Sequence, residues 1–351
     1  MSLSGYLRTP VLTGKNNDEK RQQIADYYNV TFSRYESLFE TLVSDEAYYQ
    51  KPNSLRHPLI FYYGHTATFF INKLILSGLI EQRINPKFES MFAIGVDEMG
   101  WDDLDEAHYD WPSVDEVKAY REQVHILLNE LIANIPLSLP IDWENPWWTI
   151  LMGIEHEQIH IETSSVLIRQ QALDLVRKQD AWRPWTKTSE APENMLVDIP
   201  AGNVELGKSD NLVYGWDNEY GHHKAKISAF QASRYLVSND EFLAFVEAGG
   251  YRQDDLWETE GLEWRNYTHA IFPCFWIESG DTWYLRLMTE VVPMPWDWPV
   301  EVNYHESKAF CNWKSQQCGQ VVRLPTEDEW YRLYDFSGVE ELKQDTCQLS
   351  N

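Results

Sequence analysis

The feature that most constrains the fold of this chain is a pair of histidines, His156 and His160, set four residues apart in a long apolar run. An asparagine and a proline at 145–146, typical of a helix start, precede the run, so both histidines are expected on one helix. Four residues turn a helix by a net angle of only about 40°, and both imidazoles therefore lie on the same face. This spacing supplies two ligands of a metal site, and the fold has to bring a third ligand opposite this helix.

The residues alone leave the class of metal site open, because the motif His-Glu-x-x-His also occurs in zinc peptidases. In that class Glu157 would serve as the general base. Glu162 points about 200° away from His160 around the helix, so it cannot complete a set of two histidines and one carboxylate. Position 166, where one peptidase class has a third histidine, is Val166. A third ligand is therefore expected from another segment.

A single histidine, His65, lies in an aromatic-rich run at 61–70 that is typical of a buried helix. With His156 and His160 it can form a site of three histidines. A lone histidine in such a run is more often a core residue than a ligand, and that interpretation stays open here. His125, on a later expected helix, could also face inward, and we interpret it as a structural residue.

The periodicity of apolar residues predicts four helices in the first half of the chain. They are expected at residues 20–45, 58–80, 113–133 and 145–177, with an irregular acidic crossing at 85–112. A capping box at Ser113 and Glu116 begins the third helix. Four helices with one apolar face each make a bundle, and bundles hold metal ions with side chains that project inward from facing helices.

The residue pattern changes after position 177, and this change predicts a second domain. Residues 178–196 are polar and contain prolines, as a linker does, and separate a helical domain at 20–177 from a domain at 197–351. The second domain has short alternating segments, a helix from about 302 to 313, and a helix capped by Thr326. The expected fold class is therefore α+β.

The composition favours small-molecule partners. The 351 residues carry a formal net charge of −26, which opposes binding to nucleic acid or to anionic membranes, because phosphate contact depends on lysine and arginine. Four cysteines are too sparse for a disulfide framework or a four-thiolate zinc site. The N-terminal residues lack the apolar core of a signal peptide, and no run reaches membrane-spanning length. We expect a reducing, cytoplasmic compartment, and we make no prediction of the oligomeric state.

Several motifs of the second half occur in an order that resembles the domain of formylglycine-generating and sulfatase-modifying proteins, a mixed fold similar to C-type lectins. These motifs are Ile199-Pro200-Ala201-Gly202, Val237-Ser238-Asn239-Asp240-Glu241-Phe242, Gly249-Gly250-Tyr251, Ala309-Phe310-Cys311-Asn312-Trp313 and Arg323-Leu324-Pro325-Thr326-Glu327. The first half resembles a DinB-like four-helix bundle, in which Gly64-His65 and the stretch 156–162 match the metal pattern.

A DinB-like bundle followed by such a domain is the layout of the iron-dependent sulfoxide synthases of ergothioneine and ovothiol biosynthesis, and the resemblance covers nearly all of the chain after residue 20. Within that family the chain is most similar to the ovothiol branch, the 5-histidylcysteine sulfoxide synthases. The motifs that carry this likeness are at residues 62–67, 155–165 and 214–221.

The resemblance implies an Fe(II) ion held by His65, His156 and His160, and a reaction of cysteine, histidine and O₂ that joins sulfur to an imidazole carbon. The neighbouring specificity, γ-glutamylcysteine with a methylated histidine, stays open. Glu162 is expected either close behind the ligands or on the helix surface. Residues 215–221 are expected to form either a loop near the substrate or a plain turn.

Proteins of this family continue past the segment at 323–327, so the resemblance implies a second domain that is incomplete at its C-terminal end. The family's catalytic tyrosine is then expected beyond Asn351. We expect an exposed apolar patch and unpaired strand edges around 302–335, and iron binding without efficient sulfoxide synthesis. An inactive metal-binding module and, as a further alternative, a zinc hydrolase remain open.

Overall fold

A computed structural model describes residues 8–93, 110–210 and 212–338. The chain divides into two compact units, each described by itself below. One unit comprises Met1–Pro184 with Asp210–Trp216 and Leu287–Glu290, and the other comprises Trp185–Ser209, Asp217–Arg286 and Val291–Asn351. The fold class is α+β, as predicted, because the first unit is helical and the second combines helices with small antiparallel sheets.

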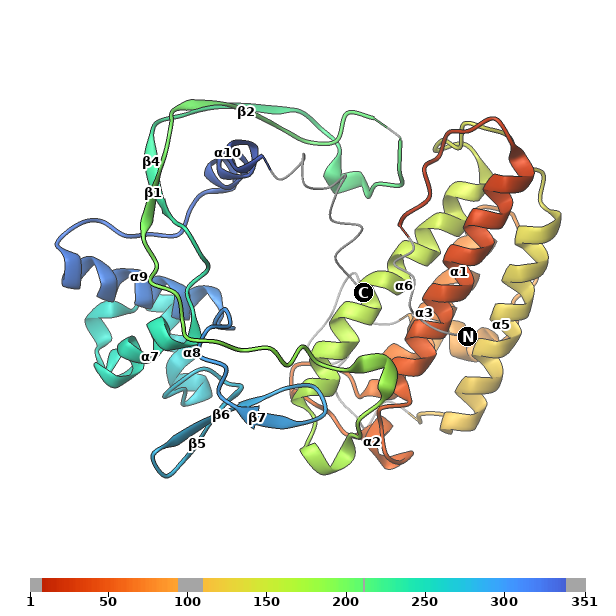
Figure 1. The fold of residues 1–351 in the computed structure, drawn as a ribbon. Helices are drawn as coiled ribbons and strands as arrows, with labels where there is room; N and C mark the ends of the chain where they lie inside the picture. Colours follow the sequence, from red (N-terminus) through yellow and green to blue (C-terminus); the bar gives the residue numbers. More distant parts are fainter. Residues whose placement is uncertain (1–7, 94–109, 211, 339–351) are drawn as a thin grey trace. The chain divides into compact units, whose positions relative to one another are not determined.

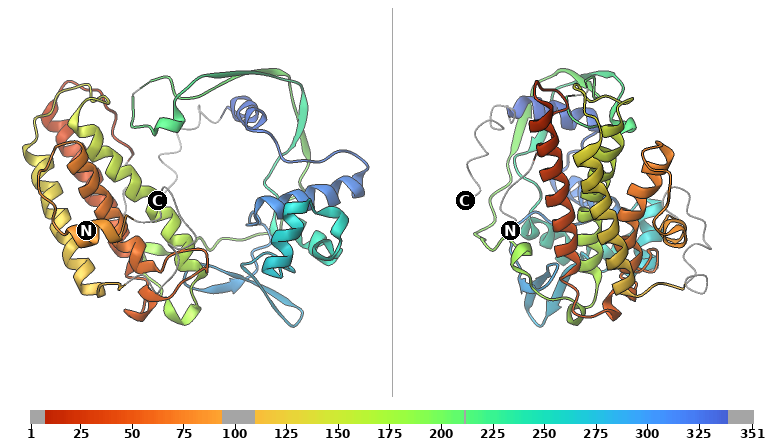
Figure 2. Two further views of the ribbon diagram at one scale, coloured as in Figure 1. Left: turned by 180° about the vertical axis from the view of Figure 1, so that it is seen from behind. Right: turned by 90° about the vertical axis from the view of Figure 1, so that its right-hand side faces the viewer.

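The first unit is a four-helix bundle. Its long helices are α1 (Asn17–Phe39), α3 (Leu59–Leu76), α5 (Val114–Asn134) and α6 (Pro146–Gln170). Helices α1 and α3 each pack against both α5 and α6, as Figures 1 and 2 show from different sides. Shorter elements accompany them: α2 (Glu46–Tyr49), α4 (Pro86–Met91) and the 3-10 turns Leu173–Leu175 and Asp180–Trp182. The described residues include no helix that is both long enough and apolar enough to cross a membrane.

The predicted starts of α5 and α6 are confirmed. Ser113 accepts a hydrogen bond from the backbone N–H of Glu116, whose side chain in turn accepts from the backbone N–H of Ser113. The side chain of Asn145 accepts from the N–H of Trp147, and Pro146 occupies the first turn, where its missing N–H has no cost. Both caps satisfy backbone donors that the helix itself leaves unpaired.

The predicted ends of three helices were wrong. Helix α6 ends at Gln170, seven residues early, because the chain beyond it turns to pair Val176 with Leu42 in an antiparallel bridge. Leu42 is the other residue of this bridge, and a residue paired in this way cannot be part of a helix. Helix α1 therefore ends at Phe39, well before residue 45. Helix α3 ends at Leu76, before a glycine at 78 with a positive φ of 71°.

The stretch 85–112 was predicted as irregular, and part of it is helical. Helix α4 begins after Asn85, whose side chain accepts from the N–H of Phe88, with Pro86 in its first turn. This is the same signal that predicted α6, and it was overlooked in an acidic segment. Residues 94–109 of the predicted crossing lie outside the described residues.

In the described residues of the second unit there are three small antiparallel sheets. Their strands are β1 (Leu196–Ile199) with β4 (Phe230–Ser233), β2 (Gly202–Leu206) with β3 (His223–Ile227), and β5 (Trp276–Ser279), β6 (Thr282–Arg286) and β7 (Val291–Pro293) in that order. The helices are α7 (Asn239–Glu247), α8 (Thr259–Thr268), α9 (Tyr304–Cys318) and α10 (Glu327–Ser337), with 3-10 turns at Asp217–Glu219, Gly250–Arg252 and Asp254–Leu256. Residues 183–195 contain no strand and no helix of more than one turn.

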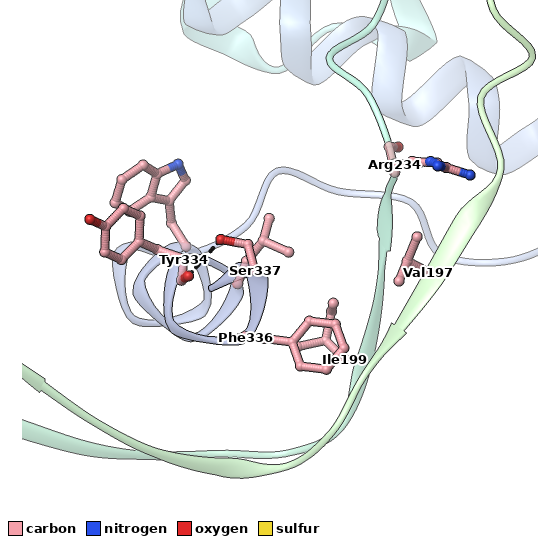
Figure 3. A pocket seen from close by; sticks show the side chains of 9 residues that line it. Val197, Ile199, Arg234, Tyr334, Phe336 and Ser337 are labelled. Atoms are coloured by element: carbon pink, nitrogen blue, oxygen red, sulfur yellow. Dashed lines mark hydrogen bonds between the residues drawn. The ribbon is translucent and has the colours of Figure 1, made fainter. Parts of the chain in front are cut away.

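Exposed apolar side chains were predicted around residues 302–335, and of the two helices in this region, α9 and α10, the prediction holds for α10. Helix α9, which starts with an Asn303 capping box, buries Phe310 and Trp313 against the aromatic side chains of α7. Helix α10 starts with the predicted Thr326 capping box but buries none of its residues, and Trp330 is 52% exposed. A cavity of about 370 Å³ lies between α10 and the β1–β4 pair, as Figure 3 shows. The predicted tail at 340–351 lies outside the described residues.

Candidate metal centre

Three histidines converge inside the bundle. His65 comes from the middle of α3, and His156 and His160 come from adjacent turns of α6. One ring nitrogen of each lies within 4.8 Å of those of the other two, and the Nε2 atoms of His65 and His156 are 3.2 Å apart. His65 and His156 are buried, and His160 is partly exposed. In the described part of the chain no other group of three histidine, cysteine, aspartate or glutamate side chains meets in this way.

Glycines let the elements that carry the ligands approach closely. A Cβ atom on Gly153 of α6 would lie 2.1 Å from the ring of Phe70 on α3, so α3 and α6 could not pack as they do with a larger residue there. A Cβ atom on Gly64 would lie 2.5 Å from the ring of Phe92, just after α4. Gly64 therefore admits Phe92 next to His65.

The orientation of the His65 ring is fixed from behind. Its Nδ1 lies 2.7 Å from the carbonyl oxygen of Phe92, which can only accept a hydrogen bond, so Nδ1 carries the proton. The Nε2 lone pair then points toward the cluster, which is the arrangement of metal-binding histidines in general. The His156 ring is stacked face to face on Phe69, with ring centroids 3.7 Å apart.

The two histidines of α6 keep a metal-binding protonation state. Burial holds the pKa of His156 well below its ordinary value, and the neighbouring His160 and His65 lower it further. Burial, and then His65, lowers the pKa of His160 to about 3. The Nδ1 atoms of both rings are buried and have no hydrogen-bond partner in the described residues. Neutral imidazoles with unsatisfied nitrogens are suited to a divalent metal ion, which needs deprotonated ligands.

The motif glutamate faces away from the cluster. Glu157 is 1% exposed, and its Oε1 accepts hydrogen bonds from Arg121 of α5 at 3.0 Å and from Thr66 of α3 at 3.1 Å. A general base of a metallohydrolase has to reach a water on the metal, and this carboxylate is occupied in the bundle core instead. The geometry therefore disfavours the hydrolase interpretation.

The other sequence candidates lie outside the cluster. Glu162 is exposed on α6. His125 contacts the hydroxyl of Tyr28 at 3.2 Å and is stacked on Phe32, with centroids 4.1 Å apart. In the stretch 214–221, Tyr214 is buried against a tryptophan of α6 and residues 217–219 form a 3-10 turn.

Sequence reasoning missed two residues near the cluster: Phe92, whose carbonyl oxygen contacts His65, and Arg121, which is bonded to Thr66 and Glu157 next to the ligands. Phe92 acts through its backbone carbonyl, which has no signature in a sequence. Arg121 did carry a signal, because it lies four residues after Val117 and three before Val124, on the apolar face of its helix. A charged residue at such a position has to find partners inside the bundle.

Both halves of the chain match known domain families. Residues 27–164 match the DinB superfamily, and residues 183–333 match the Sulfatase-modifying factor enzyme 1-like domain. The helical unit is thus a DinB domain and the mixed unit a domain of the sulfatase-modifying type. The two matches follow one another along the chain and together account for most of residues 27–333.

Curated relatives match between about half and nine tenths of the chain. The chain is 28% identical to Ergothioneine biosynthesis protein 1 of Neurospora crassa, over 91% of this chain and 39% of that protein. It is 25% identical to Ergothioneine biosynthesis protein 1 of Schizosaccharomyces pombe, over 80% of this chain and 38% of that protein. It is 30% identical to Hercynine oxygenase of Mycolicibacterium thermoresistibile, over 51% of this chain and 38% of that protein. The chain spans about two fifths of the length of these relatives.

Proposed function

We propose that the bundle binds Fe(II) through His65, His156 and His160 and that the chain serves oxidative carbon–sulfur bond formation between a thiol and a histidine imidazole. The observation that carries this proposal is the convergence of three histidine side chains, with one ring nitrogen of each within 4.8 Å of those of the other two. Three nitrogen ligands leave half of an octahedral iron site open for substrates. The similarity to proteins named for ergothioneine biosynthesis and hercynine oxygenation supports the same chemistry.

The chain's own residues would hold and orient the ion rather than react. His65 would bind through Nε2 while Phe92 keeps its Nδ1 protonated. Phe69 fixes the plane of the His156 ring by stacking on it. A bound Fe(II) ion would supply the redox chemistry with O₂ that joining sulfur to an imidazole carbon requires.

For the substrates we propose cysteine and histidine, with a 5-histidylcysteine sulfoxide as the product. The motifs at 62–67, 155–165 and 214–221 support this branch. The competing specificity is γ-glutamylcysteine with hercynine, and the names of the relatives, Ergothioneine biosynthesis protein 1 and Hercynine oxygenase, support it. Both pairs offer a thiol and an imidazole, so the same metal site suits either one.

The test is anaerobic reconstitution with Fe(II), followed by O₂ uptake with each substrate pair and mass spectrometry of the product. We expect one Fe(II) per chain, and O₂ uptake that requires both a thiol and an imidazole substrate. A sulfoxide formed only from γ-glutamylcysteine and hercynine would replace the proposed substrates with the competing pair. Absence of Fe(II) binding, or zinc-dependent hydrolysis of peptides, would refute the proposal.

A further inference from the structure

Arg121 places a positive charge in the middle of the bundle core. Its side chain is 1% exposed, and its guanidinium carbon lies 4.9–5.1 Å from the ring centroids of Phe32, Tyr35 and Tyr63. Burying a charge in such surroundings is costly unless the group is paired and fully hydrogen-bonded. The partners of Arg121 therefore show what the charge does.

These partners form a closed triangle across three helices. Arg121 of α5 donates from Nη2 to Glu157 of α6 at 3.0 Å, and from Nη1 to the hydroxyl of Thr66 of α3 at 2.7 Å. Thr66 in turn donates to the same Glu157 oxygen at 3.1 Å. Nη1 also donates to the carbonyl of Tyr63 at 2.9 Å, and Nε donates to Glu36 of α1. All four long helices are joined at this level.

Two residues of the triangle are sequence neighbours of two histidines of the cluster. Thr66 follows His65, and Glu157 follows His156. Successive residues of a helix point about 100° apart, so each helix presents its histidine to the cluster and the next side chain to the triangle. The two helices that supply the ligands are thus cross-linked at the height of the ligands themselves.

We propose that the triangle of Arg121, Thr66 and Glu157 sets the register and rotation of α3 against α6, so that His65 and His156 meet at one metal ion. These three are positioning residues that act through the ligands. The inference rests on the proposed metal site and adds to it the residues that determine its geometry.

Stability and register can be separated experimentally. A buried ion pair often adds little net stability, and well-packed apolar residues can replace both partners without loss, whereas removal of one partner leaves a buried charge. A role in setting the helix register predicts a different result from a role in stability. If the triangle sets the register, apolar replacements keep the bundle folded, but the ligands are no longer aligned. Metal affinity, measured beside thermal stability, distinguishes the two roles.

The first experiment compares Thr66→Val with the matched control Thr68→Val. Both threonines are 0% exposed on α3, and both donate to a group outside that helix, Thr68 to the hydroxyl of Tyr120 at 3.4 Å. Affinity is measured anaerobically by titration with Fe(II) and with Co(II), whose visible spectrum reports ligand geometry. We expect Thr66→Val to bind about 10-fold more weakly with an altered Co(II) spectrum, and Thr68→Val to stay within about twofold of the wild type.

The second experiment uses the double variant Arg121→Met/Glu157→Met, which removes the buried ion pair of the triangle. The third charged group, Glu36, is partly exposed and keeps the hydrogen bond from the Tyr63 hydroxyl. We expect a melting temperature close to that of the wild type and metal affinity at least about 10-fold weaker. Wild-type affinity and spectrum in the double variant, or equal losses in Thr66→Val and Thr68→Val, would overturn the positioning role. If the wild-type chain itself fails to bind either metal, the metal site is refuted and the positioning role with it.

Discussion

Replacing Gly64 with alanine tests how closely Phe92 has to approach α3 for His65 to keep its orientation. The added Cβ atom would lie 2.5–2.7 Å from three carbons of the Phe92 ring, whereas ordinary contacts begin at 3.4 Å. Phe92 is fully buried, so its ring has no free space to enter. The ring and the backbone that carries it therefore have to move by roughly 1 Å.

The expected change in stability of Gly64→Ala is the sum of two opposed effects, and the expected change in metal affinity comes from the movement of Phe92. Overpacking a core costs about 1–3 kcal/mol, and alanine is favoured over glycine inside a helix by about 1 kcal/mol. We therefore expect a net destabilisation of about 0–2 kcal/mol. The carbonyl of Phe92 is 2.7 Å from Nδ1 of His65, and a shift of roughly 1 Å would break that bond, which should weaken metal binding about 10-fold.

The assay is thermal unfolding of Gly64→Ala combined with anaerobic Fe(II) titration. Gly250→Ala is the control, because a Cβ atom there would lie 2.0 Å from the ring of Phe245 in the other unit. The control should lose stability and keep the metal affinity of the wild type. Unchanged affinity in Gly64→Ala would show that the Phe92 carbonyl does not orient His65.

Three further predictions concern single side chains. His160→Ala should abolish Fe(II) binding and leave the helix content measured by circular dichroism intact, because alanine is the better helix former. Glu157→Gln, assayed with saturating metal, should keep turnover within about tenfold, whereas loss of a hydrolytic base costs about a hundredfold or more. A hydrogen bond from Arg323 lowers the pKa of Glu329 from the ordinary 4.5 to about 2. The ionised Glu329 therefore stabilises the fold at pH values above about 4.5, and this stabilisation is lost as the pH falls toward 2. Glu329→Gln should therefore reduce the loss of unfolding free energy seen between about pH 5 and pH 2 in wild-type denaturation curves.

The local part of this structure could be predicted from the sequence. The spacing of His156 and His160 sets them on one face of any helix, and the caps at Ser113 and Asn145 specify where two helices begin. These features depend on residues within one or two turns of each other. His65 was found as a lone histidine in an aromatic helical run and as part of the Gly64-His65 motif of DinB-like bundles, although the run alone left a core role open.

The errors arose where residues distant in the sequence decide the outcome. The end of α6 depends on the pairing of Val176 with Leu42, which no local signal around Gln170 reveals. The role of Arg121 depends on partners in three other helices, and a charged residue is usually assigned to the solvent face of its helix. Its position among the apolar residues Val117 and Val124 was the one local sign of burial.

The direction of Glu157 decides what the motif His-Glu-x-x-His means in this fold. On an isolated helix the glutamate is about 60° from His160, near enough to the metal face for either a hydrolase or a simple metal site. The choice is made by the neighbouring helices, because Arg121 and Thr66 provide a charged donor and a hydroxyl on the core side. A carboxylate is more stable with those partners than unpaired beside neutral imidazoles. The same five residues, 156–160, can therefore supply two metal ligands on one side and a link between helices on the other.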